Sequence, residues 1–187
     1  KNYNGKVIHT YKYHENGTSR TAEAMKSIDA THVVLIQGDE PLLSPEDLNQ
    51  MTRYMKNNPD HEIVNAISNI ECSSDLDDDS QVKCAINEKG RILYCFRRSP
   101  SYCSIDRQLS YIKKMLGLIG YRREVLDIIS NKRQSHIQEI ESIEQLWLIS
   151  NNININSIRL NECVPSVNVS DDIIKVKNFI EQNRYQQ

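Results

Sequence analysis

Two adjacent carboxylates, Asp39 and Glu40, stand where an apolar run ends, and their position suggests metal chemistry. They belong to the pentapeptide 37–41, Gln-Gly-Asp-Glu-Pro, which directly follows the run 32–36. Such a run is typical of a parallel strand buried on both faces, and open α/β sheets bind ligands at the carboxyl ends of their strands. Acids at such a place need a compensating cation, and Mg²⁺ is held by one or two carboxylates plus substrate phosphates. The alternative, of equal weight on spacing alone, is that Asp39 caps the next turn.

The other residue types that often carry chemistry show no matching pattern. The five cysteines include no C-x-x-C pair, so we expect free thiols in a reducing, cytoplasmic compartment rather than disulfides or a zinc site. The five histidines have no ligand-like spacing beyond His9 and His14, and no serine lies in a nucleophile elbow. The acidic stretch 75–80 lacks the glycine and the terminal glutamate of a calcium loop, so we interpret it as a solvated loop.

Elements must position these residues, and the sequence alternates β-branched runs with amphipathic stretches. The alternation indicates a single α/β domain over residues 1–187 with a mostly parallel central sheet. Strands are expected at 6–10, 32–36, 62–67, 116–121 and 153–160, with a hairpin formed by 82–86 and 91–96. Helices are expected at 22–28, 45–55, 124–131, 139–150 and 171–180, with Ser44 and Ser170 as caps. The two glycines in 116–121 predict a close backbone approach there.

Composition argues against several classes of protein. With 23 basic and 25 acidic residues the formal net charge is −2, which argues against a nucleic-acid partner held by a basic face. No apolar run approaches the roughly 18 residues of a membrane-spanning helix, so no membrane partner is expected. The chain opens with Lys1 rather than Met, and we expect a segment of a longer protein, incomplete at its N-terminus.

The pentapeptide 37–41 resembles the signature of the CMP-Kdo synthetases, the 3-deoxy-manno-octulosonate cytidylyltransferases. The stretch 116–122, Leu-Gly-Leu-Ile-Gly-Tyr-Arg, is similar to the family's Leu-Gly-Ile-Tyr-Gly-Tyr-Arg. Further segments resemble its other motifs in the same order, at 14–20, 82–83, 93–97, 143–146 and 167–173. Several motifs in one order are far more specific than any one of them.

The resemblance implies a Mg²⁺-dependent cytidylyltransferase with the fold of the nucleotide-diphospho-sugar transferases and a projecting β-hairpin. Such an enzyme transfers CMP from CTP to a 3-deoxy-ulosonic acid such as Kdo and releases pyrophosphate, in the synthesis of lipopolysaccharide precursors. The family's dimers imply that the hairpin 82–96 joins a second copy of the chain. Apolar side chains on both faces of this hairpin agree with that expectation.

The resemblance also implies a role for each matched residue. Asp39 and Asn168 would hold the metal, and Asp39 and Arg97 would carry the catalysis, with the Arg97 guanidinium on the sugar carboxylate. The remaining matched residues are implied to bind the nucleotide, at Gly17, Thr18 and Arg20, and the sugar, at Gln37, Arg97, Tyr121, Glu144 and Gln145.

Three departures from the family's pattern fall within the implied site. Asn168 replaces a metal-binding carboxylate, Met115 a histidine and Ile119 a tyrosine, so we expect weaker metal binding and a less polar sugar pocket. The family's Gly/Arg/Lys-rich phosphate loop is expected upstream of Lys1. Three alternatives stay open: a cytidylyltransferase for another, acylneuraminate-like sugar acid, a weakened homologue that acts as a binding or assembly module, or another nucleotidyl- or glycosyltransferase that shares the sheet.

Overall fold

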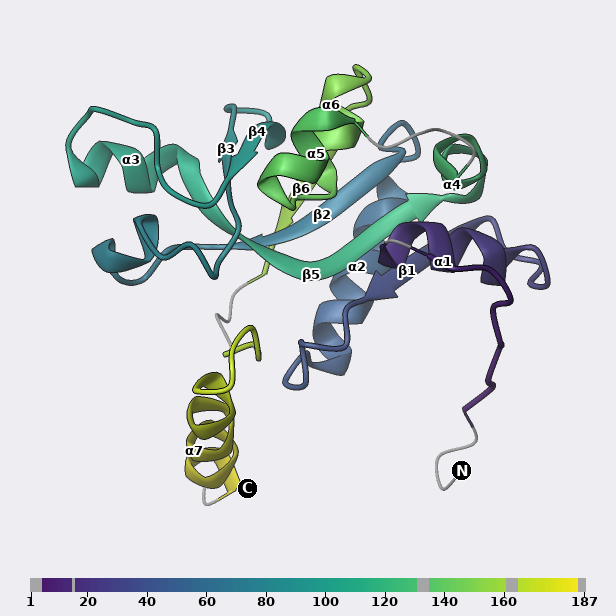
Figure 1. Ribbon diagram of the computed structural model, residues 1–187, viewed down its shortest axis with the longest axis horizontal. Coiled ribbons are helices and arrows are strands. Elements are labelled where there is room, and N and C mark those ends of the chain that lie inside the picture. The colour runs from purple at the N-terminus through teal and green to yellow at the C-terminus, as the bar shows by residue number, and fades with distance from the viewer. Residues whose placement is uncertain (1–4, 15, 131–134, 161–164, 185–187) are drawn as a thin grey trace.

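Strands and helices alternate along the chain, as the sequence predicts. The computed structural model describes residues 5–14, 16–130, 135–160 and 165–184, so Cys163 and the expected helix end at Asn131 lie outside the described residues. The helices are α1 Gly17–Met25, α2 Pro45–Asn57, the 3₁₀ helix η1 Ser73–Leu76, α3 Ile105–Tyr111, α4 Arg123–Ser130, α5 His136–Glu141, α6 Gln145–Ser150 and α7 Asp172–Arg184 (Figure 1). The strands are β1 His32–Ile36, β2 Ile63–Ser68, β3 Lys83–Ile86, β4 Arg91–Phe96, β5 Ile112–Arg122 and β6 Ile155–Arg159.

Helix α2 begins at Pro45, as the sequence predicts, and ends at Asn57, two residues beyond the predicted range. Ser44 and Asp47 form a reciprocal capping box: the Ser44 hydroxyl accepts from the Asp47 N–H, and the Asp47 carboxylate accepts from the Ser44 N–H. Pro45 occupies the first turn, where its missing N–H costs nothing, and Asn58 caps the C-terminus. These local signals fix the direction in which the chain leaves the pentapeptide 37–41.

A six-stranded mixed sheet forms the centre of the molecule, in the order β1-β5-β2-β6-β4-β3. Among the described strands only β2 and β6 pair in parallel, so the prediction of a mostly parallel sheet is wrong. β1 and β2 run in the same direction, as expected of a crossover through α2. However, β5 lies between them and pairs antiparallel with both, which leaves β1 at an edge of the sheet.

The hairpin of β3 and β4 is part of this sheet, so the prediction of a projecting hairpin is also wrong. β3 pairs with the start of β5, and β4 pairs with β6, which closes the ring β5-β2-β6-β4-β3. The 11-residue length of β5 allows this, because its first residues pair with β3 and its later residues with β1. The turn 87–90 is as predicted, and Gly90 lies in the left-handed region at φ +75°.

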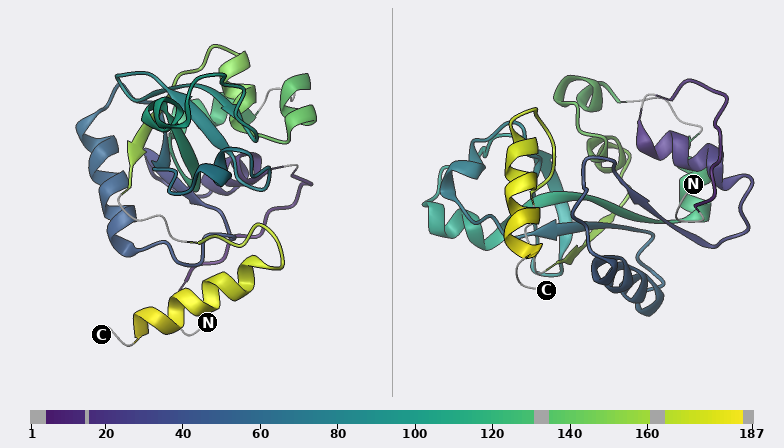
Figure 2. Two further views of the ribbon diagram at one scale, coloured as in Figure 1. Left: turned by 90° about the vertical axis from the view of Figure 1, so that its left-hand side faces the viewer. Right: turned by 90° about the horizontal axis from the view of Figure 1, so that it is seen from below.

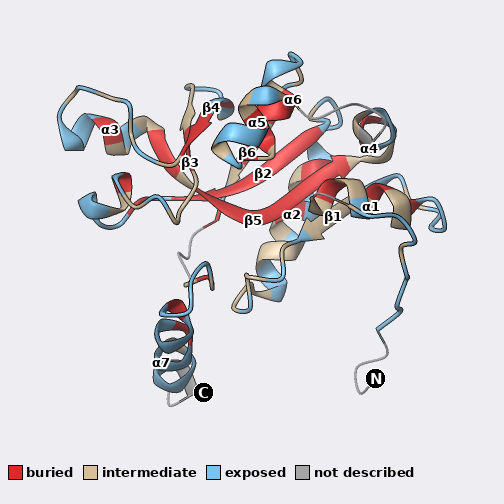
Figure 3. Cartoon of the chain, viewed as in Figure 1, coloured by how far each residue is buried: buried red, intermediate tan, exposed pale blue. Residues whose placement is uncertain are grey.

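Helices cover both faces of the sheet. On one face, Met51 and Met55 of α2 pack against Val64 of β2. On the other face, α1, α4 and α6 pack over a core that includes Met25 and Trp147. Figures 1 and 2 show α2 and the pair α5–α6 on opposite sides of the sheet, and Figure 3 shows that β2 and most of β5 are buried.

Three expected elements differ in the structure. The helix expected at 22–28 is α1, which begins at Gly17 and ends at Met25. Residues 6–10 form no strand and pair with no described strand, and Val7 is 77% exposed. The helix expected over 139–150 is two short helices, because Ser142 adopts a left-handed backbone at φ +52° that ends α5. α6 then starts with Glu144 as its N-cap residue.

Helix α7 lies apart from the sheet (Figures 1 and 2). The segment before it is tied to the pentapeptide, because the Val167 N–H donates to the Asp39 carbonyl at 2.9 Å. The Asp172 carboxylate then accepts from the N–H groups of Asn168 and Val169, each at 3.0 Å. Within the described part of the chain, no helix is long and apolar enough to cross a bilayer.

Candidate active site

The turn that follows β1 is fixed by contacts with Gly117 of β5. The Gln37 N–H donates to the Gly117 carbonyl at 2.8 Å, and the Gly117 N–H donates to Glu40 Oε1 at 2.7 Å. A Cβ at position 117 would lie 2.8 Å from Glu40 Cγ and 2.9 Å from Gln37 Cβ. Only glycine therefore fits there, and the close backbone approach predicted for this segment is confirmed.

Asp39 and Asn168 lie in the same cavity. The hydrogen bond from Val167 to the Asp39 carbonyl brings the residue next to Val167, Asn168, beside this turn. Asp39 Oδ1 is buried and has no hydrogen-bond partner among the described residues. The Asn168 amide donates to the Ser166 hydroxyl at 3.1 Å, which leaves the side-chain oxygen as its acceptor group. A buried carboxylate oxygen without a donor favours a cation as its partner.

The cavity has a volume of about 360 Å³ and opens beside this turn. Seven of the residues predicted for the site line it: Gly17, Gln37, Asp39, Arg97, Glu144, Gln145 and Asn168. Three predicted residues, Thr18, Arg20 and Tyr121, are not among its lining residues. The structure thus brings together both metal positions and four of the five sugar positions, while Tyr121 and two of the three nucleotide positions do not line the cavity.

Thr18 and Tyr121 lie buried behind the wall and support Glu144. The Thr18 hydroxyl and the Tyr121 hydroxyl are 2.7 Å apart, and Glu144 forms hydrogen bonds with Thr18. Burial raises the pKa of the Glu144 carboxyl, and the hydrogen bonds with Thr18 oppose this only in part. Burial also raises the pKa of the Tyr121 hydroxyl, with a further contribution from the nearby Glu144 charge. These contacts join the first turn of α1 to the start of α6.

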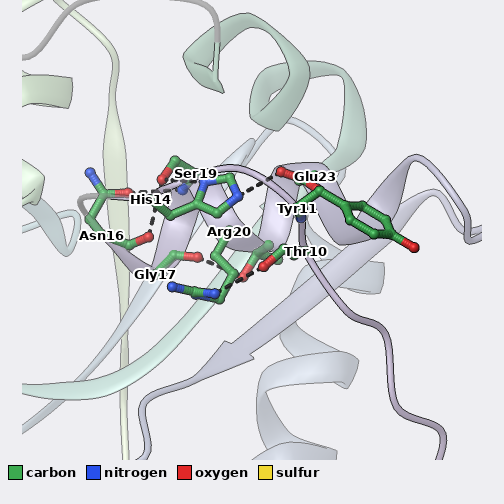
Figure 4. Close-up of polar contacts among 9 residues, drawn as sticks. Thr10, Tyr11, His14, Asn16, Gly17, Ser19, Arg20 and Glu23 are labelled. Atoms are coloured by element: carbon green, nitrogen blue, oxygen red, sulfur yellow. Dashed lines mark hydrogen bonds and ion pairs between the residues drawn. The ribbon is translucent and has the colours of Figure 1, made fainter.

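Arg20 of α1 does not line the cavity and contacts the segment before this helix (Figure 4). Its guanidinium donates to the Thr10 hydroxyl at 2.9 Å. On the same helix, the His14 ring bridges the Ser19 hydroxyl at 3.1 Å and the Glu23 carboxylate at 2.7 Å (Figure 4). His14 therefore has a structural role here, in holding the segment before α1 against this helix.

Arg97 lines the cavity, and all three of its side-chain nitrogens donate to backbone carbonyls. Nη1 donates to Asp79 O at 2.7 Å, Nε to Glu141 O at 3.2 Å and Nη2 to Ser142 O at 3.1 Å. The expected partner of this guanidinium is a sugar carboxylate. In the structure, its hydrogen bonds instead tie the end of β4 to the acidic loop and to the junction of α5 and α6.

Gln145 is held by Asn65 of β2, a residue that the sequence analysis did not identify. Gln145 Nε2 donates to Asn65 Oδ1 at 3.2 Å, and the Asn65 amide donates to the carbonyls of Ala66 at 2.8 Å and Leu116 at 3.1 Å. Asn65 is fully buried in β2. Its signal in the sequence is a polar residue within the apolar run Ile-Val-Asn-Ala-Ile, where an amide needs partners.

Lys114 is a second cavity residue that sequence reasoning missed, and it adds a positive charge near Glu40. Burial and the neighbouring Asp39 charge raise the pKa of the Glu40 carboxyl, while the Gly117 N–H and the Lys114 charge lower it. The cavity therefore combines three acidic side chains, Asp39, Glu40 and Glu144, with two cations, Arg97 and Lys114.

The two apolar replacements occupy different places. Met115 lines the cavity, is 9% exposed, and joins Val82 and Ile143 in an apolar part of the wall. Ile119 lies in the core and is not a lining residue. Met115 is thus the replacement that a bound substrate would touch.

Asp39 and Asn168 carry side-chain oxygens of the kind that could hold a magnesium ion. Mg²⁺ keeps several waters and takes one or two protein oxygens plus phosphate oxygens, so one carboxylate and one amide oxygen suffice. No group of three or more His, Cys, Asp or Glu side chains in the described residues is arranged to hold a metal. An all-protein metal cage is therefore not what this part of the chain forms.

Comparison with known proteins identifies the family of this chain. The family model for cytidylyltransferases matches residues 1–156. A 3-deoxy-manno-octulosonate cytidylyltransferase of Escherichia coli is 32% identical over 183 residues, covering 96% of this chain and 72% of the relative. The corresponding protein of Fusobacterium nucleatum is 29% identical over 183 residues, covering 97% of this chain and 74% of the relative.

Solved structures give the same result. The structure of CMP:2-keto-3-deoxy-manno-octonic acid synthetase complexed with CTP has a TM-score of 0.86 at 29% identity, covering 97% of this chain and 75% of that one. An apo UDP-glucose pyrophosphorylase has a TM-score of 0.63 at 15% identity, covering 92% of this chain and 62% of that one, and it shares the fold alone. The mixed α/β fold is thus that of the nucleotide-diphospho-sugar transferases. The chain belongs to the cytidylyltransferase family, among the 3-deoxy-manno-octulosonate cytidylyltransferases.

Proposed function

We propose that this chain transfers CMP from CTP to a 3-deoxy-ulosonic acid such as Kdo, with release of pyrophosphate, in the synthesis of lipopolysaccharide precursors. The observation that carries the proposal is the buried Asp39 Oδ1, unpartnered among the described residues and in the same cavity as Asn168. The same cavity holds Gln37, Glu144 and Gln145, whose side chains can bond sugar hydroxyls. Family membership and this combination of a cation position with hydroxyl-binding groups support one reaction.

The proposed cofactor is Mg²⁺, held by Asp39 and the Asn168 side-chain oxygen together with substrate phosphates. When bound, the ion would neutralise phosphate charge and help to align the attacking hydroxyl with the phosphorus. Asn168 supplies an oxygen without a charge, so we expect a higher Mg²⁺ requirement than two carboxylates would give.

In the proposed step, a hydroxyl of the sugar acid forms a bond to the α-phosphorus of CTP. The bond from that phosphorus to the bridging oxygen breaks, pyrophosphate leaves, and the hydroxyl proton passes to solvent. Gln37 and Gln145 would orient the sugar through its hydroxyls, and the positive charges of Lys114 and of Arg97 in the cavity wall would attract its carboxylate and the phosphates. Gly17, where α1 begins, would face the nucleotide, with Thr18 and Tyr121 holding that turn in place.

The apolar wall formed by Met115, Val82 and Ile143 favours a second candidate substrate. A hydroxyl placed against Met115 finds no hydrogen-bond partner on that side chain, whereas an acyl methyl group packs there without loss. An acylneuraminate-like sugar acid is therefore the alternative substrate.

We also propose a homodimer formed through the β3–β4 hairpin. Leu93 and Tyr94 of β4 are 50% and 39% exposed, although both are large apolar side chains. A two-fold related copy would bury both residues twice, since the same patch occurs on each subunit.

Pyrophosphate release in the presence of CTP, Mg²⁺ and Kdo tests the proposed reaction. We expect turnover that disappears in Asp39→Asn, which keeps the shape of the side chain and removes its charge. Asp60→Asn, at an exposed turn after α2, is the matched control and should keep the wild-type rate. Release with an acylneuraminate and none with Kdo would move the proposal to the second substrate, and no release with either would overturn it.

A further inference from the structure

The guanidinium of Arg97 caps the C-terminus of α5. The last carbonyls of a helix have no partner within the helix, and an arginine side chain can satisfy them. Arg97 donates to Glu141 O and Ser142 O, the carbonyls at the end of α5, at 3.2 and 3.1 Å. Its third bond, to Asp79 O at 2.7 Å, fixes the guanidinium from the side of the acidic loop.

The carbonyl groups that Arg97 holds belong to a turn with an unfavourable backbone. Ser142 has φ +52° and ψ +43°, a left-handed conformation in which a side chain is disfavoured and glycine is not. The Ser142 side chain is exposed, so packing around it does not enforce the conformation. The two hydrogen bonds from Arg97 are therefore the contacts that stabilise this turn from the sheet side.

The turn directly precedes the sugar-binding positions. Glu144 and Gln145 follow Ser142 by two and three residues, and both line the cavity. Glu144 forms hydrogen bonds with Thr18 of α1, and Gln145 donates to Asn65 of β2. These contacts fix the start of α6 against α1 and β2. Ile143, which separates Ser142 from Glu144 and is 2% exposed, packs in the core, and Arg97 adds an anchor on the β4 side.

We infer that Arg97 is a positioning residue, which holds the left-handed turn at Ser142 and through it places Glu144 and Gln145 for the sugar acid. An ion pair with the substrate carboxylate would need only the positive charge of Arg97. The positioning role needs a fork of several N–H donors that reaches carbonyls on two segments of the chain. Lysine keeps the charge and lacks the fork, so Arg97→Lys separates the two roles. The inference rests on the proposed function where it is tested by KM values. The test by tryptophan fluorescence does not depend on that function.

The test uses Arg97→Lys, Arg97→Ala and the double variant Arg97→Ala/Ser142→Gly. We expect both single variants to raise the KM for the sugar acid by about tenfold or more, with little change in the KM for CTP. Glycine favours the left-handed turn by itself, so Ser142→Gly should recover about fivefold of that loss in the double variant. Arg98→Ala, which removes the neighbouring exposed guanidinium, is the matched control and should leave both KM values unchanged.

The only tryptophan of the chain, Trp147, reports the position of α6 without any substrate. It is 5% exposed, so displacement of α6 should increase acrylamide quenching of its fluorescence in Arg97→Lys and Arg97→Ala, and Ser142→Gly should reverse this. A near-normal Arg97→Lys, unchanged quenching in Arg97→Ala, or no recovery in the double variant would each overturn the inference. If the wild-type chain transfers no CMP, the proposed function fails, while the quenching comparison still decides the inference.

Discussion

At the scale of single residues, the proposal of a metal site depends on one atom, Asp39 Oδ1. Asp39 Oδ1 is buried with no partner in the described part of the chain, and Asn168 lines the same cavity with an uncharged oxygen. A second carboxylate here would raise the attraction for a divalent cation. We therefore expect Asn168→Asp to lower the Mg²⁺ concentration for half-maximal activity by about tenfold.

The measurement is a Mg²⁺ titration of pyrophosphate release. Asn178→Asp adds the same charge on the exposed side of α7 and is the matched control. An unchanged Mg²⁺ requirement in Asn168→Asp would place the cation elsewhere.

We expect Met115 to influence which sugar acids the cavity prefers. Met115→His introduces a hydrogen-bonding ring where the wall is apolar, so a hydroxylated substrate gains a partner there. We expect the ratio of kcat/KM values, Kdo over an acylneuraminate, to rise by about 10- to 100-fold. Competition between the two sugar acids at fixed CTP measures this ratio directly, and a fall in the ratio would contradict the role of the wall.

At the scale of elements, the turn after β1 depends on the absence of a side chain at Gly117. Gly117→Ala would place a Cβ 2.8 Å from Glu40 and 2.9 Å from Gln37, so the turn and β5 must separate. We expect a loss of about 1–3 kcal/mol in the free energy of unfolding and a larger loss of activity. Gly38→Ala is the control for stability, because a Cβ there meets nothing within 4 Å.

The Glu144 carboxyl at the start of α6 should make the free energy of unfolding depend on pH. Burial raises the pKa of Glu144 in the folded chain above 4.5, so between 4.5 and the folded pKa the native state binds more protons than the unfolded state. Glu144 thus reduces the free energy of unfolding as pH rises through this window. Glu144→Gln removes the effect, so the Tm difference, variant minus wild type, should grow from pH 4 to pH 7. Glu71→Gln, at an exposed carboxyl, is the control, and equal slopes for the two variants would contradict this reasoning.

Local signals predicted the elements well, and pairing between distant segments was not predictable from them. The capping box at Ser44 and the turn at Gly90 depend on a few neighbouring residues, and both are as predicted. The strand direction of β5 depends on which strands it lies between, and a run of apolar residues carries no such information. The left-handed backbone of Ser142 was not predictable for the same reason, because the hydrogen bond to its carbonyl comes from Arg97, 45 residues earlier.

For the candidate site, too, residues in local sequence motifs were predicted, and residues brought in by packing between distant segments were not. The pentapeptide predicted Asp39 and the order of motifs predicted Asn168, Glu144 and Gln145, and the structure places all four in one cavity. Lys114 and Asn65 were missed because their importance arises from packing across the sheet. Burial of a polar residue in a strand is visible in the sequence only as an exception to its pattern.

At the scale of the whole molecule, the closed ring of strands leaves the outer side of β4 without cover. Leu93 and Tyr94 are exposed there, and a second copy related by a two-fold axis would bury both. Removing a buried leucine costs about 1.5–3 kcal/mol, and the symmetry applies this cost twice. Leu93→Asp should therefore weaken the dimer by at least about a hundredfold in Kd. Sedimentation velocity over a concentration series measures this, with Ile140→Asp, at an exposed position on α5, as the matched control. A wild-type chain that sediments as a monomer at every concentration, or equal weakening by both variants, would refute the hairpin interface.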